Sequence, residues 1–202
     1  GFANISVPSV LATLVSDKLN FPNLSMVGVD DRAAAYQAVS YLIQQGHRKI
    51  AVLGGPATSY PSMMRRQGAQ QAMEDAGIRF EDKLYGLSNY DFESAYHAMN
   101  GLLARRAEFT ALFAMSDVIA FGAIRALVSA GLRVPEDVSV IGFDGITMSR
   151  YCVPVMTTIV QPSEQIALQS IELLVRQIEH GTPAQTVTLQ PELQQGESVR
   201  AI

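Results

Sequence analysis

The chain has 202 residues, of which 48% are hydrophobic and 17% charged, and its formal net charge is −4 with neutral histidines. This composition is too apolar for a disordered chain and predicts a packed core. An acidic balance without a run of basic residues argues against a nucleic-acid-binding surface on the chain itself. The single cysteine, Cys152, excludes an intrachain disulfide and a Cys-based zinc cage, and no apolar run approaches the roughly 20 residues of a membrane span.

Short apolar runs alternate along the chain with longer segments of helical period. The strands expected from these runs are, in chain order, 9–12, 26–29, 50–53, 83–87, 111–115, 138–143, 157–160 and 186–189. The helices expected between them run from Asp31 to just before Gly46, and over 62–76, 92–105, 117–130 and 164–179. This order of strands and helices predicts an α/β fold with a mostly parallel sheet covered by helices on both faces.

The spacing of apolar residues also predicts the buried face of three helices. For the helix that starts at Asp31, the expected inward residues are Ala35, Ala38, Val39, Leu42 and Ile43. For the helix at 117–130 they are Val118, Phe121, Ile124, Leu127 and Val128. For the helix at 164–179 they are Ile166, Ile171, Leu174 and Ile178, and Glu172 is placed to pair with Arg176 one turn later.

Polar residues follow nearly every predicted strand, where ligands of open parallel sheets bind. These residues are Thr13, Asp30, Asp31, Tyr90, Ser116, Asp117, Asp144 and Gln161, together with the Gly-Gly-Pro loop at 54–56. Arg65 joins them because it lies in the first turns after that loop. An arginine fork donates to adjacent hydroxyls, a carboxylate such as Asp144 accepts from hydroxyls, and Tyr90 offers a flat apolar face. Together these side chains predict a site for a sugar or a similar polyol.

Each of these residues also has a structural interpretation. An aspartate before a glycine, as at Asp144, is a natural turn pair. Ser116 most simply caps the helix that follows it, and Asp117 supplies a favourable charge at the start of the same helix. Arg65 stands next to Arg66, and one or both are open to being solvated surface residues.

The motifs of common enzyme classes are absent. The loop at 54–56 lacks the Lys and Ser/Thr of a phosphate-binding P-loop, and neither G-x-S-x-G nor H-E-x-x-H occurs. A carboxylate pair for hydrolysis stays open, drawn from Asp30, Asp31, Asp117 and Asp144. The sequence therefore disfavours an enzyme and predicts neither a cofactor nor a metal site.

Three stretches are distinctive enough to point to a family. They are GHRKIAVLGGP at 46–56 with the MRRQGAQQAMEDAGI that follows, the segment 109–146 containing GLRVPEDVSVIGFDG, and TTIVQP at 157–162. These stretches resemble the LacI/GalR family of bacterial transcription regulators. The resemblance implies a periplasmic-binding-protein-like fold, in which two Rossmann-like lobes with parallel sheets surround a cleft and are joined by three crossover strands.

The same resemblance implies how the chain divides between the lobes. Residues 1–29 plus 161–185 would form the remainder of an incomplete N-terminal lobe, and residues 30–160 plus 186–202 the C-terminal lobe. The family's helix-turn-helix headpiece and the opening part of its first lobe precede the region matched here. We therefore expect a fragment that does not bind operator DNA by itself.

The resemblance also assigns roles to residues of the polar set. It places Arg65 as the arginine that holds the ligand, Asp144 as the acceptor of its hydroxyls and Tyr90 as an aromatic wall. Gln161 falls at a crossover beside the ligand.

Three positions depart from the pattern of sugar-binding members. Ser116 stands where those members often have asparagine, Thr13 where some have aspartate, and Pro61 where others use a hydroxyl donor. These departures alter the polar contacts that distinguish one small molecule from another, so they leave the identity of the ligand open.

The implied function is allosteric control of transcription in the cytoplasm. A small effector, a sugar or related polyol, would bind between the lobes of a homodimer and change its affinity for operator DNA through the headpiece. The alternative is a periplasmic sugar-binding protein of a transporter, because such proteins share the fold and the chemistry of the cleft.

Overall fold

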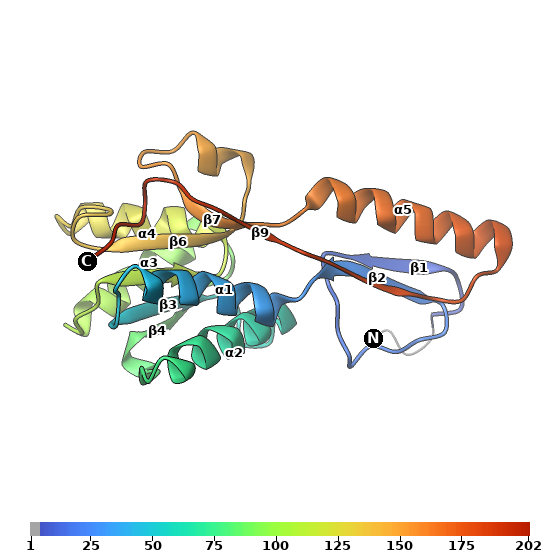
Figure 1. The fold of residues 1–202 in the computed structure, drawn as a ribbon, viewed down its shortest axis with the longest axis horizontal. Helices are drawn as coiled ribbons and strands as arrows, with labels where there is room; N and C mark the ends of the chain where they lie inside the picture. Colours follow the sequence, from blue (N-terminus) through green and yellow to red (C-terminus); the bar gives the residue numbers. More distant parts are fainter. Residues whose placement is uncertain (1–4) are drawn as a thin grey trace. The chain divides into compact units, whose positions relative to one another are not determined.

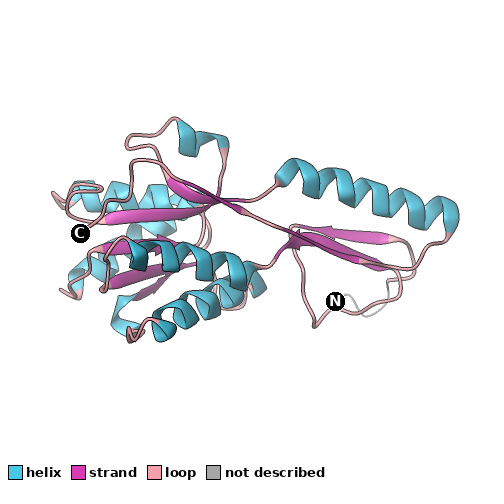
Figure 2. Ribbon diagram, viewed as in Figure 1, coloured by secondary structure: helices cyan, strands magenta, loops and turns pink. Residues whose placement is uncertain are grey.

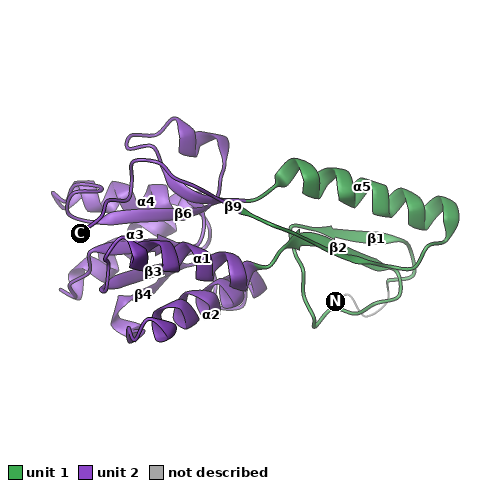
Figure 3. Ribbon diagram, viewed as in Figure 1, with its two compact units in different colours: residues 1–30, 161–191 green, residues 31–160, 192–202 purple. Residues whose placement is uncertain are grey.

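The computed structural model describes residues 5–202, which belong to two compact units (Figure 3). Unit 1 comprises Gly1–Asp30 and Gln161–Pro191, and unit 2 comprises Asp31–Val160 and Glu192–Ile202. The expected change of lobe at residue 186 is wrong, because β8 (Thr186–Leu189) pairs in parallel with β2 (Leu24–Val29) and so belongs to unit 1. The chain enters unit 2 for the last time only after Pro191.

Unit 2 is built on a six-stranded sheet with the strand order β4-β3-β5-β6-β7-β9. The strands are β3 (Ile50–Gly54), β4 (Tyr85–Leu87), β5 (Ala111–Ala114), β6 (Ser139–Asp144), β7 (Thr157–Val160) and β9 (Glu192–Gln194). All neighbours pair in parallel except β9, which is antiparallel to β7. Every residue of β3 and β5 is buried, as expected for parallel strands with helices on both faces.

Four helices cover this sheet, two on each face (Figures 1 and 2). They are α1 (Asp31–Gln44), α2 (Tyr60–Asp75), α3 (Phe92–Ala104) and α4 (Asp117–Ser129), with short 3-10 turns at η1 (Asp82–Leu84) and η2 (Thr147–Arg150). Helix α1 packs against α2, and α3 packs against α4. After β4 the chain adds its next strands on the other side of β3. Since parallel strands are joined by right-handed crossovers, this change sends α2 to one face of the sheet and α3 and α4 to the other.

Unit 1 is smaller and has a three-stranded parallel sheet, β1-β2-β8, with β1 at Ser9–Ala12. The helix α5 (Ser163–His180) packs on this sheet, and Val27, Ile166 and Leu173 form the buried core between them. A polar bridge adds to the core: the Ser25 hydroxyl donates to Gln177 Oε1 at 2.9 Å.

The ranges of the predicted elements agree closely with the structure, and the parallel sheet is confirmed. The first residues of the expected strand at 83–87 belong instead to the 3-10 turn η1. The observed strand β4 occupies only the second part of the expected range. The strand β9 was not predicted, because its three residues, Glu-Leu-Gln, carry no strand pattern. It pairs with β7 through the backbone alone as the chain re-enters unit 2.

The predicted inward faces are right for α1 and only partly right for α4 and α5, where Leu127 and Ile166 are buried as expected. In α1, Ala35, Ala38, Val39 and Leu42 are buried as expected, and Ile43 is half-buried. In α4 the buried face combines Ile119 and Leu127 with small residues around Gly122 and Ala123, whereas Val128 is 52% exposed. In α5 Leu173 and Gln177 are buried, and Ile171 and Ile178 are exposed. No helix within residues 5–202 is long and apolar enough to cross a bilayer.

Glycines explain why α4 turns its small residues inward. A Cβ at Gly122 would overlap the backbone of Phe92 on α3, and a Cβ at Gly68 on α2 would overlap the carbonyl oxygen of Arg32 on α1. Within each pair, the two helices therefore approach one another at backbone distance. Large apolar side chains between them would not allow this approach.

We expect Gly68→Ala to destabilise the fold by about 1–3 kcal/mol, because the added methyl group forces α1 and α2 apart. Gly101→Ala is the matched control, since Gly101 lies in α3 with nothing within 4 Å of an added Cβ. It should stabilise the protein by roughly 0.5–1 kcal/mol, as alanine does in an open helical position. Urea unfolding followed by circular dichroism measures both, and equal effects of the two substitutions would contradict the close-packing explanation.

Candidate functional site

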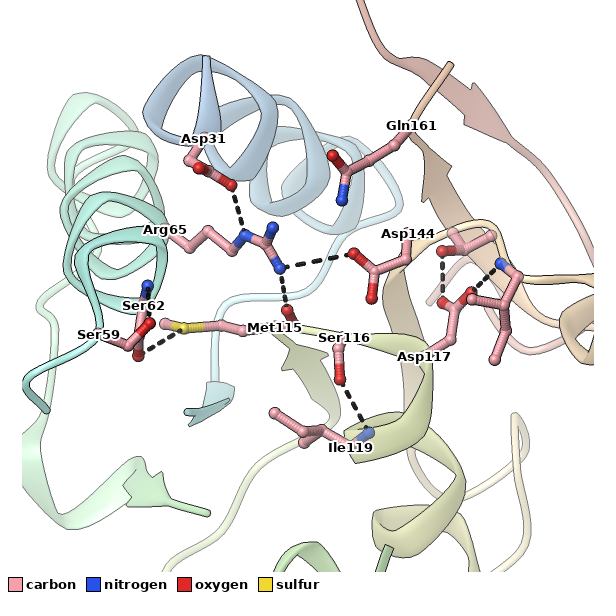
Figure 4. A network of polar contacts seen from close by, with 12 residues as sticks. Asp31, Ser59, Ser62, Arg65, Met115, Ser116, Asp117, Ile119, Asp144 and Gln161 are labelled. Atoms are coloured by element: carbon pink, nitrogen blue, oxygen red, sulfur yellow. Dashed lines mark hydrogen bonds and ion pairs between the residues drawn. The ribbon is translucent and has the colours of Figure 1, made fainter. Parts of the chain in front are cut away.

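The carboxyl ends of β5 and β6 and the start of α2 bring one arginine and several carboxylates together in unit 2 (Figure 4). Arg65 reaches from the second turn of α2 toward the end of β6, where Asp144 is the last residue. Its Nη1 lies 3.7 Å from Asp144 Oδ1. The structure therefore brings together these two members of the predicted polar set.

The Arg65 guanidinium is buried and held on several sides. Its Nε donates to Asp31 Oδ1 at 2.7 Å, and its Nη1 donates to the carbonyl oxygen of Met115. Its Cζ lies 3.7 Å from the centroid of the Phe143 ring, a cation–π contact. Only 7% of the Arg65 side chain is exposed. The solvated interpretation is therefore wrong for Arg65, and the fork has one fixed direction, toward Asp144.

Asp144 occupies an unusual turn at the end of β6. Its φ is +116°, and the following Gly145 has a φ of +72°. A non-glycine residue in this region is strained unless its surroundings hold it there. The Asp144 carboxylate is 27% exposed beside the buried guanidinium, so it is accessible to a hydroxyl group. The turn interpretation of Asp144 is thus confirmed, and its role as a ligand acceptor stays a prediction.

Asp117, the first residue of α4, is fully buried behind this turn. Its carboxylate accepts hydrogen bonds from Thr158 Oγ1 at 2.6 Å and from the backbone N–H of Ile146 at 2.8 Å. Burial, together with the negative charge of Asp144, raises the pKa of Asp117 to about 6, and the hydrogen bonds that the carboxylate accepts limit this shift. Asp117 is therefore more than a favourable charge at a helix start, because it joins α4 to β7 and to the turn.

Ser116 is used as a helix cap. Its Oγ accepts from the backbone N–H of Ile119 at 3.1 Å, and the residue is 4% exposed. The capping interpretation is confirmed.

Tyr90 and Pro61 lie near the loop that follows β3. The Tyr90 ring lies against Gly55, where a Cβ would overlap the ring, and the φ of Tyr90 is +60°. The buried Tyr90 hydroxyl has no hydrogen-bond partner within residues 5–202. Pro61 is in the first turn of α2, and the adjacent Ser62 donates its hydroxyl to the carbonyl of Gly55 at 3.2 Å. Pro61 itself offers no donor at this place.

Thr13 and Gln161 belong to unit 1. Thr13 directly follows β1 and has a φ of +66°, and Gln161 is the first residue after β7. Their assignment to the ligand site stays a prediction.

Sequence reasoning missed three of the groups that hold Arg65. Asp31 was noted only as a polar residue after a strand, and its place at the start of α1 was the available signal. The Met115 carbonyl and the Phe143 ring gave no signal, because a backbone oxygen and a strand residue look like ordinary parts of a buried sheet. No cluster of histidine, cysteine and acidic residues suited to a metal ion occurs in the described part of the chain.

Comparisons with known proteins identify this architecture. A family model described as a periplasmic binding protein-like domain matches residues 39–199. The HTH-type transcriptional regulator MalR of Clostridium butyricum is 37% identical over 198 residues, which cover 98% of this chain and 59% of MalR. A sugar-binding transcriptional regulator of the LacI family from Escherichia coli is 30% identical with a TM-score of 0.80, covering 89% of this chain and 69% of that one. The chain belongs to the LacI family, as a periplasmic binding protein-like domain.

Solved structures of LacI-family proteins resemble this domain closely. The transcriptional regulator CelR in complex with cellobiose has a TM-score of 0.84 and 34% identity, covering 89% of this chain and 56% of that one. A LacI-family regulator from Enterococcus faecium with bound ribose has a TM-score of 0.81 and 28% identity, covering 89% of this chain and 66% of that one. The chain described here thus spans 59% of the length of MalR and 56% and 66% of these two solved chains.

We expect Arg65→Met to destabilise the domain by about 3 kcal/mol, because it removes the cation that faces the buried Asp31 carboxylate. Asp144→Asn should change stability by less than about 1 kcal/mol, since the Asp144 carboxylate is partly exposed and 3.7 Å from the guanidinium. Urea unfolding at pH 7 measures the stability of both variants. Equal losses of stability would show that Arg65 is not held mainly by Asp31.

The raised pKa of Asp117 makes stability depend on pH. The ordinary pKa of 3.8 becomes about 6 in the folded state, so between these values the folded chain keeps a proton that the unfolded chain has released. The free energy of unfolding due to this group therefore falls as the pH rises through this window, by about 3 kcal/mol, and levels off above it. Urea titrations of wild type and Asp117→Asn from pH 4 to pH 7 measure the difference, and a constant difference would contradict the shift.

Proposed function

We propose that this chain is the effector-binding domain of a bacterial transcription regulator and that it binds an uncharged sugar or related polyol. The observation that carries the proposal is the pairing of a buried, directed arginine with the partly exposed carboxylate of Asp144. Donor and acceptor groups held side by side in this way suit two neighbouring hydroxyls.

The charges around Arg65 favour an uncharged ligand. The positive charge of Arg65 already faces the carboxylates of Asp31 and Asp144, and Asp117 lies behind the turn as a third carboxylate. This face of unit 2 therefore offers no excess positive charge to a phosphate or a carboxylate. Two relatives agree in kind, since one was solved with cellobiose and another with ribose, whereas a third was solved with phosphate.

The same relatives support a regulator over a transport protein. MalR is named an HTH-type transcriptional regulator, and CelR a transcriptional regulator. We infer that the effector alters operator affinity through a DNA-binding headpiece outside this chain, in a cytoplasmic homodimer. A coupling of roughly 1–3 kcal/mol would change that affinity about 5- to 150-fold.

We also infer that the domain is not an enzyme. Asp31 and Asp144 both face Arg65, which separates them. Asp117 is fully buried, so it is not open to a substrate. The carboxylates therefore do not flank an open space as an acid and a nucleophile of a glycosidase do.

Calorimetry with cellobiose, D-ribose and D-ribose 5-phosphate tests the proposal. We expect one of the two uncharged sugars to bind and Asp144→Ala to weaken its binding by about tenfold or more, because ligand hydroxyls lose their acceptor. Asp82→Ala is the control, since Asp82 is an exposed carboxylate of unit 2 that pairs with Arg66. Wild-type affinity in Asp144→Ala would remove Asp144 from the site, and preference for D-ribose 5-phosphate would overturn the uncharged ligand.

A further inference from the structure

The turn after β6 directs the Asp144 carboxylate, and this turn is not a relaxed one. Asp144 and Gly145 both have a positive φ, at +116° and +72°. The space around Gly145 is also restricted, because an added Cβ would lie 2.7 Å from a methyl group of Val160. A strained backbone persists only where neighbouring groups hold it. The structure must therefore contain an anchor for this turn.

The Asp117 carboxylate is placed to be that anchor. It accepts the backbone N–H of Ile146 at 2.8 Å, and the backbone of Gly145 makes a further hydrogen bond to it. On its other side it accepts the Thr158 hydroxyl at 2.6 Å. It also occupies the space that Gly142 leaves by having no side chain, since a Cβ there would overlap Oδ1 of Asp117. One carboxylate thus ties the turn to the adjacent strand β7.

The position of Asp117 is unfavourable for a charged group. The titratable neighbours are Asp144, whose charge raises the pKa of Asp117, and the Cys152 thiol, whose own pKa is raised by burial and by the charge of Asp117. Thr158 and the turn amides are uncharged donors. Since the ionised carboxylate lowers stability near neutral pH, the residue serves something other than stability.

We propose that Asp117 is a positioning residue for the ligand site: its carboxylate holds the 144–146 turn so that Asp144 faces Arg65. Asp117 is fully buried, so it acts through Asp144 and not by touching the ligand. This proposal rests on the proposed function, because it concerns the affinity of the same face for hydroxyl groups. Loss of the anchor lets the turn relax and moves the Asp144 carboxylate away from its productive place.

Nuclear magnetic resonance tests the positioning without any ligand. In the wild type, the amide signals of Gly145 and Ile146 and the guanidinium signals of Arg65 should titrate together with a midpoint near pH 6. In Asp117→Asn these signals should lose that titration, and the Arg65 signals should shift. Asp137→Asn is the matched control, because Asp137 also accepts a backbone N–H, from Arg133, but in a loop away from Arg65.

Calorimetry with D-ribose and cellobiose tests the consequence for binding. Asp117→Asn should weaken binding of whichever sugar the wild type takes by about tenfold, as happens when the partners that orient metal ligands are removed. The affinity of the wild type for the sugar should also fall by about tenfold as the pH drops below about 6, because Asp117 takes up a proton. The control Asp137→Asn should show the same pH dependence as the wild type. Gly142→Ala is a second variant, because it displaces the Asp117 carboxylate without removing it.

The outcomes separate the two proposals. Unchanged Arg65 signals and unchanged sugar affinity in a folded Asp117→Asn would overturn the positioning role, as would an equal loss in Asp137→Asn. If Asp117→Asn does not fold, the pH titration of the wild type tests the positioning role. Arg65 signals that do not change with pH around the Asp117 midpoint would then overturn this role. Failure of the wild type to bind either sugar counts against the proposed function. In that case the ligand-free titration still tests the positioning role of Asp117.

Discussion

The candidate site depends on one buried cation and the groups that hold it. A guanidinium with 7% of its side chain exposed is tolerated only when charge and hydrogen bonds replace the water it has lost. Asp31 supplies the charge, the Met115 carbonyl accepts a second hydrogen bond, and the Phe143 ring covers one face. These three groups come from the start of α1, the end of β5 and the end of β6, so the sheet and its helices must all be in register before Arg65 points toward Asp144.

Two aspartates close to one another differ in role because they differ in exposure. Asp144 is partly open to solvent beside Arg65, and its carboxylate is available to a hydroxyl group. Asp117 is closed in behind the turn, where burial raises its pKa to about 6 and its oxygens are occupied by Thr158 and Ile146. The two carboxylates thus make separate polar contacts, Asp144 with Arg65 and Asp117 with Thr158 and Ile146 (Figure 4).

Close helix packing accounts for the part of the fold that sequence patterns misjudged. Apolar spacing favoured an inward face of Val118, Phe121, Ile124, Leu127 and Val128 for α4, and of these only Leu127 is buried. Gly122 and its alanine neighbours face inward because α3 approaches at backbone distance. In α5, Gln177 is buried because it pairs with the Ser25 hydroxyl, a partner 152 residues earlier in the chain. Periodicity weighs hydrophobicity alone, so it could not detect either a backbone approach or a distant polar partner.

By itself, the sequence determined the order of strands and helices, the strand ends at which polar residues gather, and the family. Each of these follows from apolar period or from distinctive motifs, which are local properties of the chain. It also placed Arg65 and Asp144 at one edge of the sheet, since residues that follow parallel strands share that edge. Only the tertiary structure decided that Asp31 neutralises Arg65 and that Asp117 accepts a hydrogen bond from the 144–146 turn. Each of these depends on which groups meet across the fold and how much water reaches them, and no local pattern records either.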